Sequence, residues 1–305
     1  MPRVAYLGPE GTFTEAALLQ MAAGDAIPGP ASELEPISAE TPAAALAAVR
    51  AGDADYACVP IENSIEGSVL PTLDSLSAGD PLQIYAEHTL DVAFGIAVRP
   101  GTAAADVTSV AAFPVAAAQV RRWLADHLPQ GRIVPANSNA AAAQDVANGL
   151  ADAGVSTSLA AARWGLDLLA DGVVDEPNAR TRFVLVGRPG PPPARTGADR
   201  TSVFLRLDNV PGALVSAMTE FAIRDIDLTR IESRPTRTEL GTYVFFLDCV
   251  GHIDDDPVAQ ALKALHRRCK GVRYLGSWPT GATAGAVPPP MDDAARWLTT
   301  LREGR

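Results

Sequence analysis

One segment interrupts every regular pattern in the chain: Gly187-Arg188-Pro189-Gly190-Pro191-Pro192-Pro193-Ala194-Arg195-Thr196-Gly197. Each proline lacks a backbone N–H and has a restricted φ, so neither a helix nor a strand continues through this segment. We therefore expect a stiff, solvated linker over residues 188–199. Residues 1–187 and 200–279, on either side of it, differ in pattern and predict separate domains.

Upstream of the linker, short apolar strands alternate with helical segments. Val4–Leu7 predicts a strand, and Thr12 with Glu15 forms a capping box that starts a helix. Pro42 lies at the start of a second helix, and Tyr56–Ile61 predicts the next strand. Such alternation favours parallel sheets covered by helices. Further strands are predicted at 107–111, 132–134, 153–156 and 181–187, and further helices at 114–128, 139–150 and 158–164.

Residues 82–98 form one long extended stretch. Within it, apolar side chains recur with a period of two at Leu90, Val92, Phe94, Ile96 and Val98. We predict one long strand here, with shorter α/β units on both sides. That order indicates a clamshell of two α/β lobes, the second at about 82–157, which binds its ligand between the lobes.

Downstream of the linker, the predicted strands and helices follow one another closely. The pattern predicts the order β-α-β-β-α-β, which is the ferredoxin-like arrangement. The predicted elements are strand 201–207, helix 212–224, strands 227–234 and 241–250, helix 257–270 and strand 272–278. The tail, residues 280–305, is rich in Pro, Gly and Ala at first and predicts a last amphipathic helix at 291–302.

Composition excludes several classes of protein. The 305 residues carry 25 Lys+Arg against 36 Asp+Glu, a net charge of −11 that speaks against nucleic-acid binding, and 47% are hydrophobic, which excludes disorder throughout. Neither a secretory signal nor an apolar run of about 20 residues is visible, so we expect a cytoplasmic protein that does not bind membranes. Three distant cysteines and four scattered histidines fit neither a disulfide framework nor a metal site.

Three polar clusters are candidates for chemistry. The first is Gly8-Pro9-Glu10-Gly11-Thr12-Phe13-Thr14, where free N–H groups at a helix N-terminus would suit an anionic ligand. The second is Val59-Pro60-Ile61-Glu62-Asn63-Ser64-Ile65-Glu66-Gly67-Ser68, where an apolar strand ends in polar side chains, the usual place for ligand contacts in open α/β sheets. Ordinary turns and helix caps are the alternative interpretation of both patterns.

The third cluster is Asn178-Ala179-Arg180-Thr181-Arg182-Phe183. Arginines beside a threonine could hold carboxylates by paired N–H donors while the hydroxyl faces a reacting group. A solvated charge run before a strand is the alternative interpretation.

Taken together, the three clusters resemble the signature segments of the prephenate dehydratases. The region beyond the linker resembles an ACT regulatory domain, because Pro211-Gly212-Ala213-Leu214 and Glu232-Ser233-Arg234-Pro235 are similar to its two phenylalanine-binding motifs. The resemblance runs in the right order from residue 1 to about 280 and is closest to the monofunctional actinobacterial form. One departure is Ala112-Phe113-Pro114, where many relatives carry Ser/Thr-His-Pro, so no role for a histidine can be carried over.

The resemblance implies a carbon–oxygen lyase (EC 4.2.1.51) in L-phenylalanine biosynthesis that converts prephenate to phenylpyruvate without a metal or an organic cofactor. It implies Thr181 as the catalytic residue, by hydrogen bonding to the departing hydroxyl. Arg182 would face the substrate or support the structure, and Phe183 would shape the pocket. The other substrate-binding residues would be Thr12, Phe13, Glu62, Asn63, Ser64, Ser138 and Asn139.

The resemblance also implies feedback control by L-phenylalanine, bound between ACT domains that pair in a homodimer or tetramer. The implied allosteric residues are Asn209, Pro211, Gly212, Ala213, Leu214, Glu232, Ser233, Arg234 and Pro235. Two other functions stay open at this point. The aminated substrate analogue would make the chain an arogenate dehydratase. The second open function is that of a non-catalytic, amino-acid-binding regulator. Solute-binding proteins share the clamshell of the periplasmic-binding-protein type 2 kind, so the fold alone does not decide.

Overall fold

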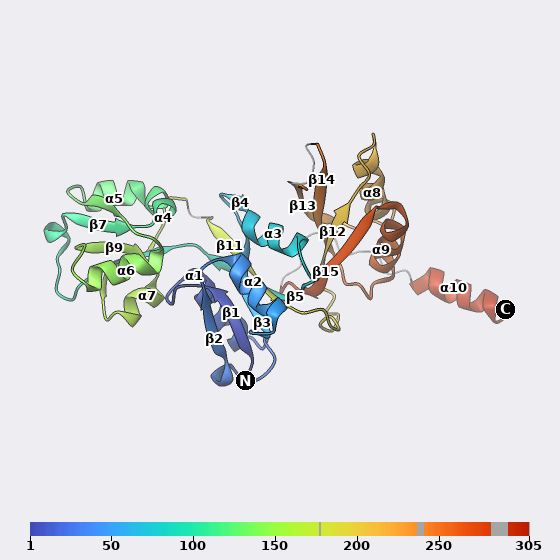
Figure 1. The fold of residues 1–305 in the computed structure, drawn as a ribbon, viewed down its shortest axis with the longest axis horizontal. Coiled ribbons are helices and arrows are strands. Elements are labelled where there is room, and N and C mark those ends of the chain that lie inside the picture. The colour runs from blue at the N-terminus through green and yellow to red at the C-terminus, as the bar shows by residue number, and fades with distance from the viewer. Residues whose placement is uncertain (177, 237–240, 282–291, 305) are drawn as a thin grey trace. The chain divides into compact units, whose positions relative to one another are not determined.

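The computed structural model describes residues 1–176, 178–236, 241–281 and 292–304. Its internal contacts divide the chain into two units. The first consists of Met1–Ser75 and His88–Val186, and the second of Leu76–Glu87 and Gly187–Arg305. The first unit holds two α/β sheets and the second holds a four-stranded antiparallel sheet (Figure 1). The predicted fold class, two α/β lobes followed by a ferredoxin-like domain, is confirmed.

The sheet of the first lobe has the order β2-β1-β3-β11-β5, with the short β4 attached to β3. β1 is parallel to both β2 and β3, as the alternating pattern predicts. In Figure 1 the yellow-green β11 lies among the blue and cyan strands of this sheet, although it comes much later in the chain. The strands are β1 (Arg3–Leu7), β2 (Glu35–Ala39), β3 (Tyr56–Asn63), β4 (Gly67–Ser68), β5 (Gln83–Asp91) and β11 (Arg180–Gly187).

Helix caps in this lobe lie where the sequence predicts them. The Thr12 side chain accepts from the Glu15 N–H at the start of α1 (Phe13–Ala23), and Thr41 caps α2 (Pro42–Ala51) in the same way. Gly52, with a φ of +84°, ends α2 in the left-handed conformation that glycine adopts readily. The lobe also contains a 3-10 turn (Ala31–Glu33) and α3 (Leu70–Ser77); neither α3 nor β2 was predicted.

The second lobe is built on a sheet of order β10-β6-β9-β7-β8. Its core includes Phe94, Ile96, Val110, Val120 and Val155, all buried. The strands are β6 (Phe94–Val98), β7 (Ser109–Ala112), β8 (Arg132–Pro135), β9 (Ala153–Ser156) and β10 (Asp167–Val173). The helices are α4 (Pro114–Gln119), α5 (Arg121–His127), α6 (Asn139–Ala147) and α7 (Ser158–Arg163), with a 3-10 turn at Ala104–Asp106.

Two predictions for this region are wrong. The single strand expected over 82–98 is two strands, because the chain leaves the first sheet after Asp91 and enters the second at Phe94. The strands of the second sheet lie within residues 94–173, since β10 pairs antiparallel with β6. β10 escaped prediction because two register shifts interrupt its alternation. The helix expected over 114–128 is interrupted at Val120, whose ψ of 13° ends α4 before α5 begins.

The second unit has the predicted β-α-β-β-α-β order. The strand order in its sheet is β13-β14-β12-β15. Phe221 of α8 and Leu265 of α9 pack with Val203, Leu205 and Leu247 on one face of the sheet. The elements are β12 (Asp199–Arg206), α8 (Ala213–Ala222), β13 (Leu228–Pro235), β14 (Tyr243–Val250), α9 (Asp256–Arg268) and β15 (Gly271–Pro279). A last helix, α10, spans Asp292–Arg302; Met291, where it was expected to begin, lies outside the described residues.

Residues 76–87 belong to this unit because they pack on its sheet. A Cβ added to Gly276 of β15 would lie 2.2 Å from the Ile84 carbonyl oxygen, so only glycine permits this approach. Arg200 of β12 forms an ion pair with Glu87 at 2.5 Å, and the Trp278 indole N–H donates to the same carboxylate at 3.0 Å. The segment 76–87 is therefore bound to the sheet by backbone packing and by a buried ion pair.

The linker is irregular, as predicted, but it is held at several points rather than free in solvent. Asp199 accepts hydrogen bonds from the backbone N–H groups of Thr196 and Gly197, and Arg195 pairs with Asp255 at 2.9 Å. The Tyr85 hydroxyl donates to the Arg188 carbonyl oxygen at 2.7 Å. The linker is thus packed within the second unit.

Candidate functional site

The centre of the candidate site is the contact between Asn63 and Thr181. Asn63 ends β3, and Thr181 lies on β11, the neighbouring strand. The Asn63 Oδ1 accepts hydrogen bonds from the backbone N–H groups of Ile65 (2.9 Å) and Glu66 (3.0 Å). This fixes the amide, so its Nδ2 points to Thr181 and donates to the Oγ1 at 3.0 Å. Since Thr181 accepts from Asn63, its own O–H remains available to donate to a ligand.

Ser64 joins the second and third sequence clusters. Its Oγ donates to the Asn178 carbonyl oxygen at 3.0 Å and accepts from the Arg180 N–H at 2.8 Å. The Ser64 N–H in turn donates to the Arg180 carbonyl oxygen at 2.8 Å. The single hydroxyl proton of Ser64 is therefore used within the protein.

Both arginines of the third cluster form ion pairs. Arg182 is buried and pairs with Glu62 at 2.9 Å, which ties β11 to β3. Arg180 is exposed and pairs with Asp91 at 2.8 Å. Phe183 is 2% exposed and lies in the core of the first lobe. Of this cluster, Thr181 is the residue whose hydroxyl proton has no acceptor within the described part of the chain.

The glycine turn after β1 contacts the second lobe. The Glu15 carboxylate, 3% exposed, accepts from the Gly11 N–H through one oxygen and pairs with Arg163 of α7 through the other. The Thr157 Oγ1, before α7, donates to the Gly11 carbonyl oxygen at 2.5 Å. Because the Gly11 N–H is bound by Glu15, this N–H is not available to an anionic ligand. The turn instead joins the two lobes.

Gly11 is required by this contact. Its φ is +85°, and a Cβ added there would lie 2.7 Å from the Ala160 Cβ and 3.5 Å from the Ala140 Cβ. The Thr12 hydroxyl is likewise engaged, since it donates to the Leu7 carbonyl oxygen at 3.1 Å. Next to it, Phe13 meets Phe94 of the second lobe edge-to-face, with ring centroids 5.6 Å apart.

The predicted residues of the second lobe lie at the start of α6. The Ser138 hydroxyl accepts from the Ala141 N–H and caps the helix. The Asn139 carbonyl oxygen accepts from the Ser156 hydroxyl at 2.6 Å, and its side-chain Oδ1 is buried without a hydrogen-bond partner in the described chain. Ala140, the next residue, is the one that approaches Gly11.

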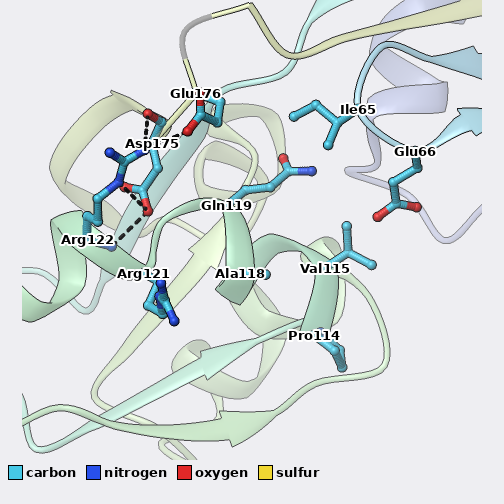
Figure 2. A pocket seen from close by; sticks show the side chains of 10 residues that line it. All are labelled: Ile65, Glu66, Pro114, Val115, Ala118, Gln119, Arg121, Arg122, Asp175 and Glu176. Carbon is cyan, nitrogen blue, oxygen red and sulfur yellow. Dashed lines mark hydrogen bonds and ion pairs between the residues drawn. The ribbon is translucent and has the colours of Figure 1, made fainter.

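A cleft of about 750 Å³ opens between the lobes beside Asn63. Figure 2 shows α4 and α5 on one side and the turn after Asn63 on the other. Asp175 caps α5 from outside the helix, since its carboxylate accepts from the N–H groups of Arg122 and Trp123. The lining residues are Ile65, Glu66, Pro114, Val115, Ala118, Gln119, Arg121, Arg122, Asp175 and Glu176.

Of these lining residues, Ile65 and Glu66 belong to the second sequence cluster, and the sequence analysis proposed none of the others as a site residue. The unbroken helix predicted over 114–128 concealed the break at Val120, where the two helices that line the cleft meet. The polar run Asp175-Glu176 before β11 carries no local signal, because Arg122, whose N–H Asp175 binds, lies 53 residues earlier in the chain. Pro114, from the segment that departs from the family pattern, lines the cleft, and Phe113 packs on the core of the second lobe.

The two predicted allosteric segments lie at the same end of the sheet in the second unit. Val244 of β14 pairs with Arg206, which ends β12, and with Arg234 near the end of β13. The loop over 209–212, which follows β12, therefore lies at the same end of the strands as residues 232–235, with β14 between β12 and β13. Asn209, Pro211, Gly212, Ser233 and Pro235 are exposed there, while Ala213, Leu214, Glu232 and Arg234 are half-buried.

Metal-ligating side chains and thiols are the other groups that could take part in chemistry. No group of three or more His, Cys, Asp or Glu side chains among them could hold a metal ion. Burial raises the pKa of the Cys58 thiol, and burial with Asp248 nearby raises the pKa of Cys249 to about 12, so neither is a thiolate at neutral pH. Within the same residues, no helix is long and apolar enough to cross a bilayer.

Comparison with known proteins identifies the family. Residues 4–191 match the family described as prephenate dehydratase, and residues 201–267 match the ACT domain. The prephenate dehydratase of Mycolicibacterium vanbaalenii is 75% identical over 311 residues, with full coverage of both chains. The prephenate dehydratase of Mycobacterium tuberculosis is 71% identical over all of this chain and 95% of its own length.

Solved structures agree. The prephenate dehydratase of Arthrobacter aurescens, in complex with L-Phe, has a TM-score of 0.87 and 41% identity over 99% of both chains. GqqA, described as a quorum-quenching acylase, has a TM-score of 0.80 and 30% identity over 91% of this chain and 98% of its own. The resemblance inferred from the three sequence clusters is confirmed. The chain belongs to the prephenate dehydratase family, as a lyase with a C-terminal ACT domain.

Proposed function

We propose that the chain converts prephenate to phenylpyruvate, and that the Asn63–Thr181 contact is the centre of this activity. The reaction consumes one proton: the prephenate dianion and H⁺ give the phenylpyruvate anion, CO₂ and H₂O. The C–O bond to the ring hydroxyl breaks, and the electron pair of the bond to the ring carboxylate enters the ring as it becomes aromatic. The protein therefore has to assist the departing hydroxyl and leave the ring carboxylate free to depart.

The fixed amide of Asn63 supports the role of Thr181. Its Nδ2 occupies an acceptor position of the Thr181 oxygen at 3.0 Å, which leaves the hydroxyl proton for the substrate. A threonine hydroxyl is a weak acid, so it assists by hydrogen bonding to the departing oxygen as negative charge develops there. Such a bond strengthens in the transition state and therefore raises kcat more than substrate affinity.

The remaining predicted residues hold this pair and shape the cleft. Ser64 and the Glu62–Arg182 ion pair fix β3 and β11 side by side, which sets the position of Thr181. Thr12 and Ser138 cap the helices that begin where the lobes meet. With these we group Phe13 and Asn139 as residues that bound the substrate site, whereas Phe183, 2% exposed, supports β11 from the core.

Replacement of Thr181 tests the proposal. Thr181→Val removes the hydroxyl with little change in volume and should lower kcat by about 100-fold or more with KM changed by less than about threefold. Thr181→Ser keeps the hydroxyl and should retain most of the activity. Each variant should be assayed on prephenate and on arogenate separately, because arogenate carries an ammonium group in place of the keto oxygen. Turnover of prephenate by Thr181→Val at the wild-type rate would overturn the assignment.

The acylase activity described for GqqA is not favoured by the site. Acyl hydrolysis by a threonine nucleophile needs a base that accepts its proton. Here the Thr181 Oγ1 contacts an amide N–H donor, which cannot act as that base. A non-catalytic binding protein is likewise not favoured, since binding alone gives no reason for this arrangement of Asn63 and Thr181.

We further propose that L-phenylalanine regulates the chain through the ACT domain, as a homodimer or tetramer. Two observations support this. The A. aurescens relative is described in complex with L-Phe. The 209–212 loop and residues 232–235 lie at the same end of the sheet. β13 is an edge strand, and Ile231 on it is 47% exposed, which suits pairing with a second copy. Sedimentation velocity with and without phenylalanine tests the assembly, and a monomer under both conditions would contradict it.

We also propose that the enzyme needs no cofactor and that it is located in the cytoplasm. Aromatisation supplies the driving force, so neither a metal nor an organic cofactor is needed. Full activity should survive exhaustive dialysis against EDTA, whereas a loss restored by a metal would refute this part. The three free cysteines, Cys58, Cys249 and Cys269, are consistent with a reducing compartment.

A further inference from the structure

Arg273 of β15 binds the C-terminal end of α3. A helix leaves its last carbonyl groups without partners inside the helix, and a cation stabilises that end. The Arg273 Nη1 donates to the carbonyl oxygens of Leu76 at 3.0 Å and Ala78 at 3.4 Å, and its Nη2 donates to that of Gly79 at 3.2 Å. Leu76 lies in the last turn of α3, and the other two residues follow the helix directly. A side chain of the ACT sheet therefore caps α3.

The opposite end of α3 is attached beside Asn63. β4 lies immediately before the helix, and its Gly67 pairs with Asn63 of β3. The Thr72 hydroxyl, in the first turn of α3, donates to the Pro60 carbonyl oxygen of the same strand at 2.7 Å. The boundary between the two units follows Ser75, so α3 contains residues of both. One helix is thus bound at its start to the strand that carries the candidate site and at its end to the ACT sheet.

A row of side chains joins Arg273 to one of the predicted allosteric segments. Residues paired directly on antiparallel strands lie on the same face of a sheet. Glu232 of β13 pairs with Phe246 of β14, which pairs in turn with Phe204 of β12. Phe204 pairs with Arg273 on its other side. The two buried rings meet edge-to-face with centroids 5.2 Å apart, and the Arg273 guanidinium lies 5.9 Å from the Phe204 centroid. Since close-packed side chains transmit a displacement, a change at Glu232 reaches Arg273.

We propose that Arg273 is the residue through which phenylalanine bound to the ACT domain acts on Asn63, by a change in how it caps α3. This rests on the proposed dehydration of prephenate and its inhibition by phenylalanine. A ligand shifts a conformational equilibrium only if it binds the two states with different affinity. Phenylalanine at residues 232–235 favours one arrangement of the row, and the cap on α3 differs between the two arrangements. The helix passes this difference through β4 to Asn63, whose amide donates to Thr181.

Arg273→Met tests this, because it keeps an unbranched side chain beside Phe204 and removes the three hydrogen bonds to the end of α3. The factor by which saturating phenylalanine lowers kcat/KM for prephenate should fall at least about fivefold. Uninhibited kcat should stay within about twofold, and calorimetry should give an affinity for phenylalanine within about threefold of wild type. Arg206→Met is the matched control and should be inhibited as wild type is. The Arg206 guanidinium lies 5.8 Å from the same ring, and none of the three hydrogen bonds comes from it.

Two results with Arg273→Met would overturn the proposal. Full inhibition at wild-type affinity for phenylalanine would show that the cap does not carry the signal. Loss of phenylalanine binding would show that the arginine belongs to the effector site instead. Wild-type protein that is inactive on prephenate, or that phenylalanine does not inhibit, would defeat the proposed function itself. An inhibitable wild type with an equally inhibitable Met variant defeats this inference alone.

Hydrogen exchange of the wild-type protein keeps the test decisive if the Met variant does not fold. Phenylalanine should change the exchange rates of the backbone N–H groups in α3. It should also change those of Ile65 and Glu66, because these two N–H groups hold the Asn63 amide. Exchange rates in α3 that stay the same at saturating phenylalanine, while kcat/KM falls, would overturn the proposal.

Discussion

Glu87 and His88 are consecutive residues of β5, yet they contact different units of the protein. The Glu87 carboxylate pairs with Arg200 and accepts from the Trp278 indole in the ACT unit. His88 Nε2 lies 2.6 Å from the Gln20 Oε1 of α1, in the first lobe. Since one peptide bond joins them, the boundary between the two units lies within β5.

We predict that Glu87→Gln uncouples inhibition from phenylalanine binding. The amide keeps hydrogen-bonding capacity toward Trp278 but removes the charge that Arg200 neutralises, so the buried pair no longer holds β5 to the ACT sheet as firmly. Uninhibited kcat should stay within about twofold, while inhibition at saturating phenylalanine weakens. Calorimetry should still detect binding. Asp91→Asn, at the exposed end of the same strand, is the control, and full inhibition of Glu87→Gln would refute the prediction.

Gly212→Val should weaken phenylalanine binding and relieve inhibition. Gly212 has a φ of +81°, and a Cβ there would meet no heavy atom within 4 Å, so the strain arises from the backbone rather than from a clash. A β-branched residue in this conformation should shift the 209–212 loop at a cost of roughly 1–2 kcal/mol. Gly212→Asn tolerates the left-handed region better and serves as the graded control. Titration calorimetry that gave wild-type affinity for the Val variant would place the effector elsewhere.

Arg163→Met should raise KM for prephenate by about 3- to 10-fold. Arg163 of α7 pairs with Glu10 and with the buried Glu15, so its loss leaves a buried carboxylate bound only by the Gly11 N–H and loosens the contact between the lobes. Glu10 is 69% exposed, and Glu10→Gln should therefore change little. Steady-state kinetics and thermal unfolding of both variants check this. Equal effects of the two substitutions would show that Glu15 is not the important partner.

Asp152→Asn should destabilise the second lobe in a pH-dependent manner. The Asp152 Oδ2 accepts from the N–H and hydroxyl groups of both Thr108 and Ser109, and these hydrogen bonds lower the pKa of Asp152 to about 2. A carboxyl group with a lowered pKa adds stability above its unfolded pKa of about 4, and this is lost as the pH falls toward 2. The difference in melting temperature between wild type and variant should thus be largest above pH 5 and shrink below pH 4. A difference independent of pH would rule out the carboxylate as its cause.

Local signals in the sequence predicted much of the fold. The capping box of Thr12 with Glu15 and the proline at position 42 predicted two helix starts correctly, because such residues act within their own turn. The elements that were predicted wrongly or missed are those that depend on distant partners in the chain. β10 has no clean alternation and exists because β6 pairs with it, and the end of α4 is supported by Asp175, more than fifty residues away.

The residues of the candidate site also divide into those that local motifs predict and those that they do not. Asn63 and Thr181 could be proposed from their motifs, and their contact follows from the adjacency of β3 and β11. Gln119 could not, since a glutamine in an alanine-rich helix carries no signal until the helix is placed beside the cleft. The contact of Gly11 with the second lobe was not predicted, because the Thr157 hydroxyl that binds its carbonyl oxygen lies 146 residues further along the chain.

The position of β11 between β3 and β5 has a consequence for synthesis on the ribosome. Residues 94–173 contain every strand of the second sheet, so this lobe can fold as soon as it has emerged. The first sheet cannot: until residues 180–187 are made, β5 has no neighbour and β3 exposes one edge. Chains that stop before residue 180 would therefore present two unpaired apolar strands, and such edges recruit other chains. Premature termination in this interval should yield aggregates rather than a soluble, inactive fragment.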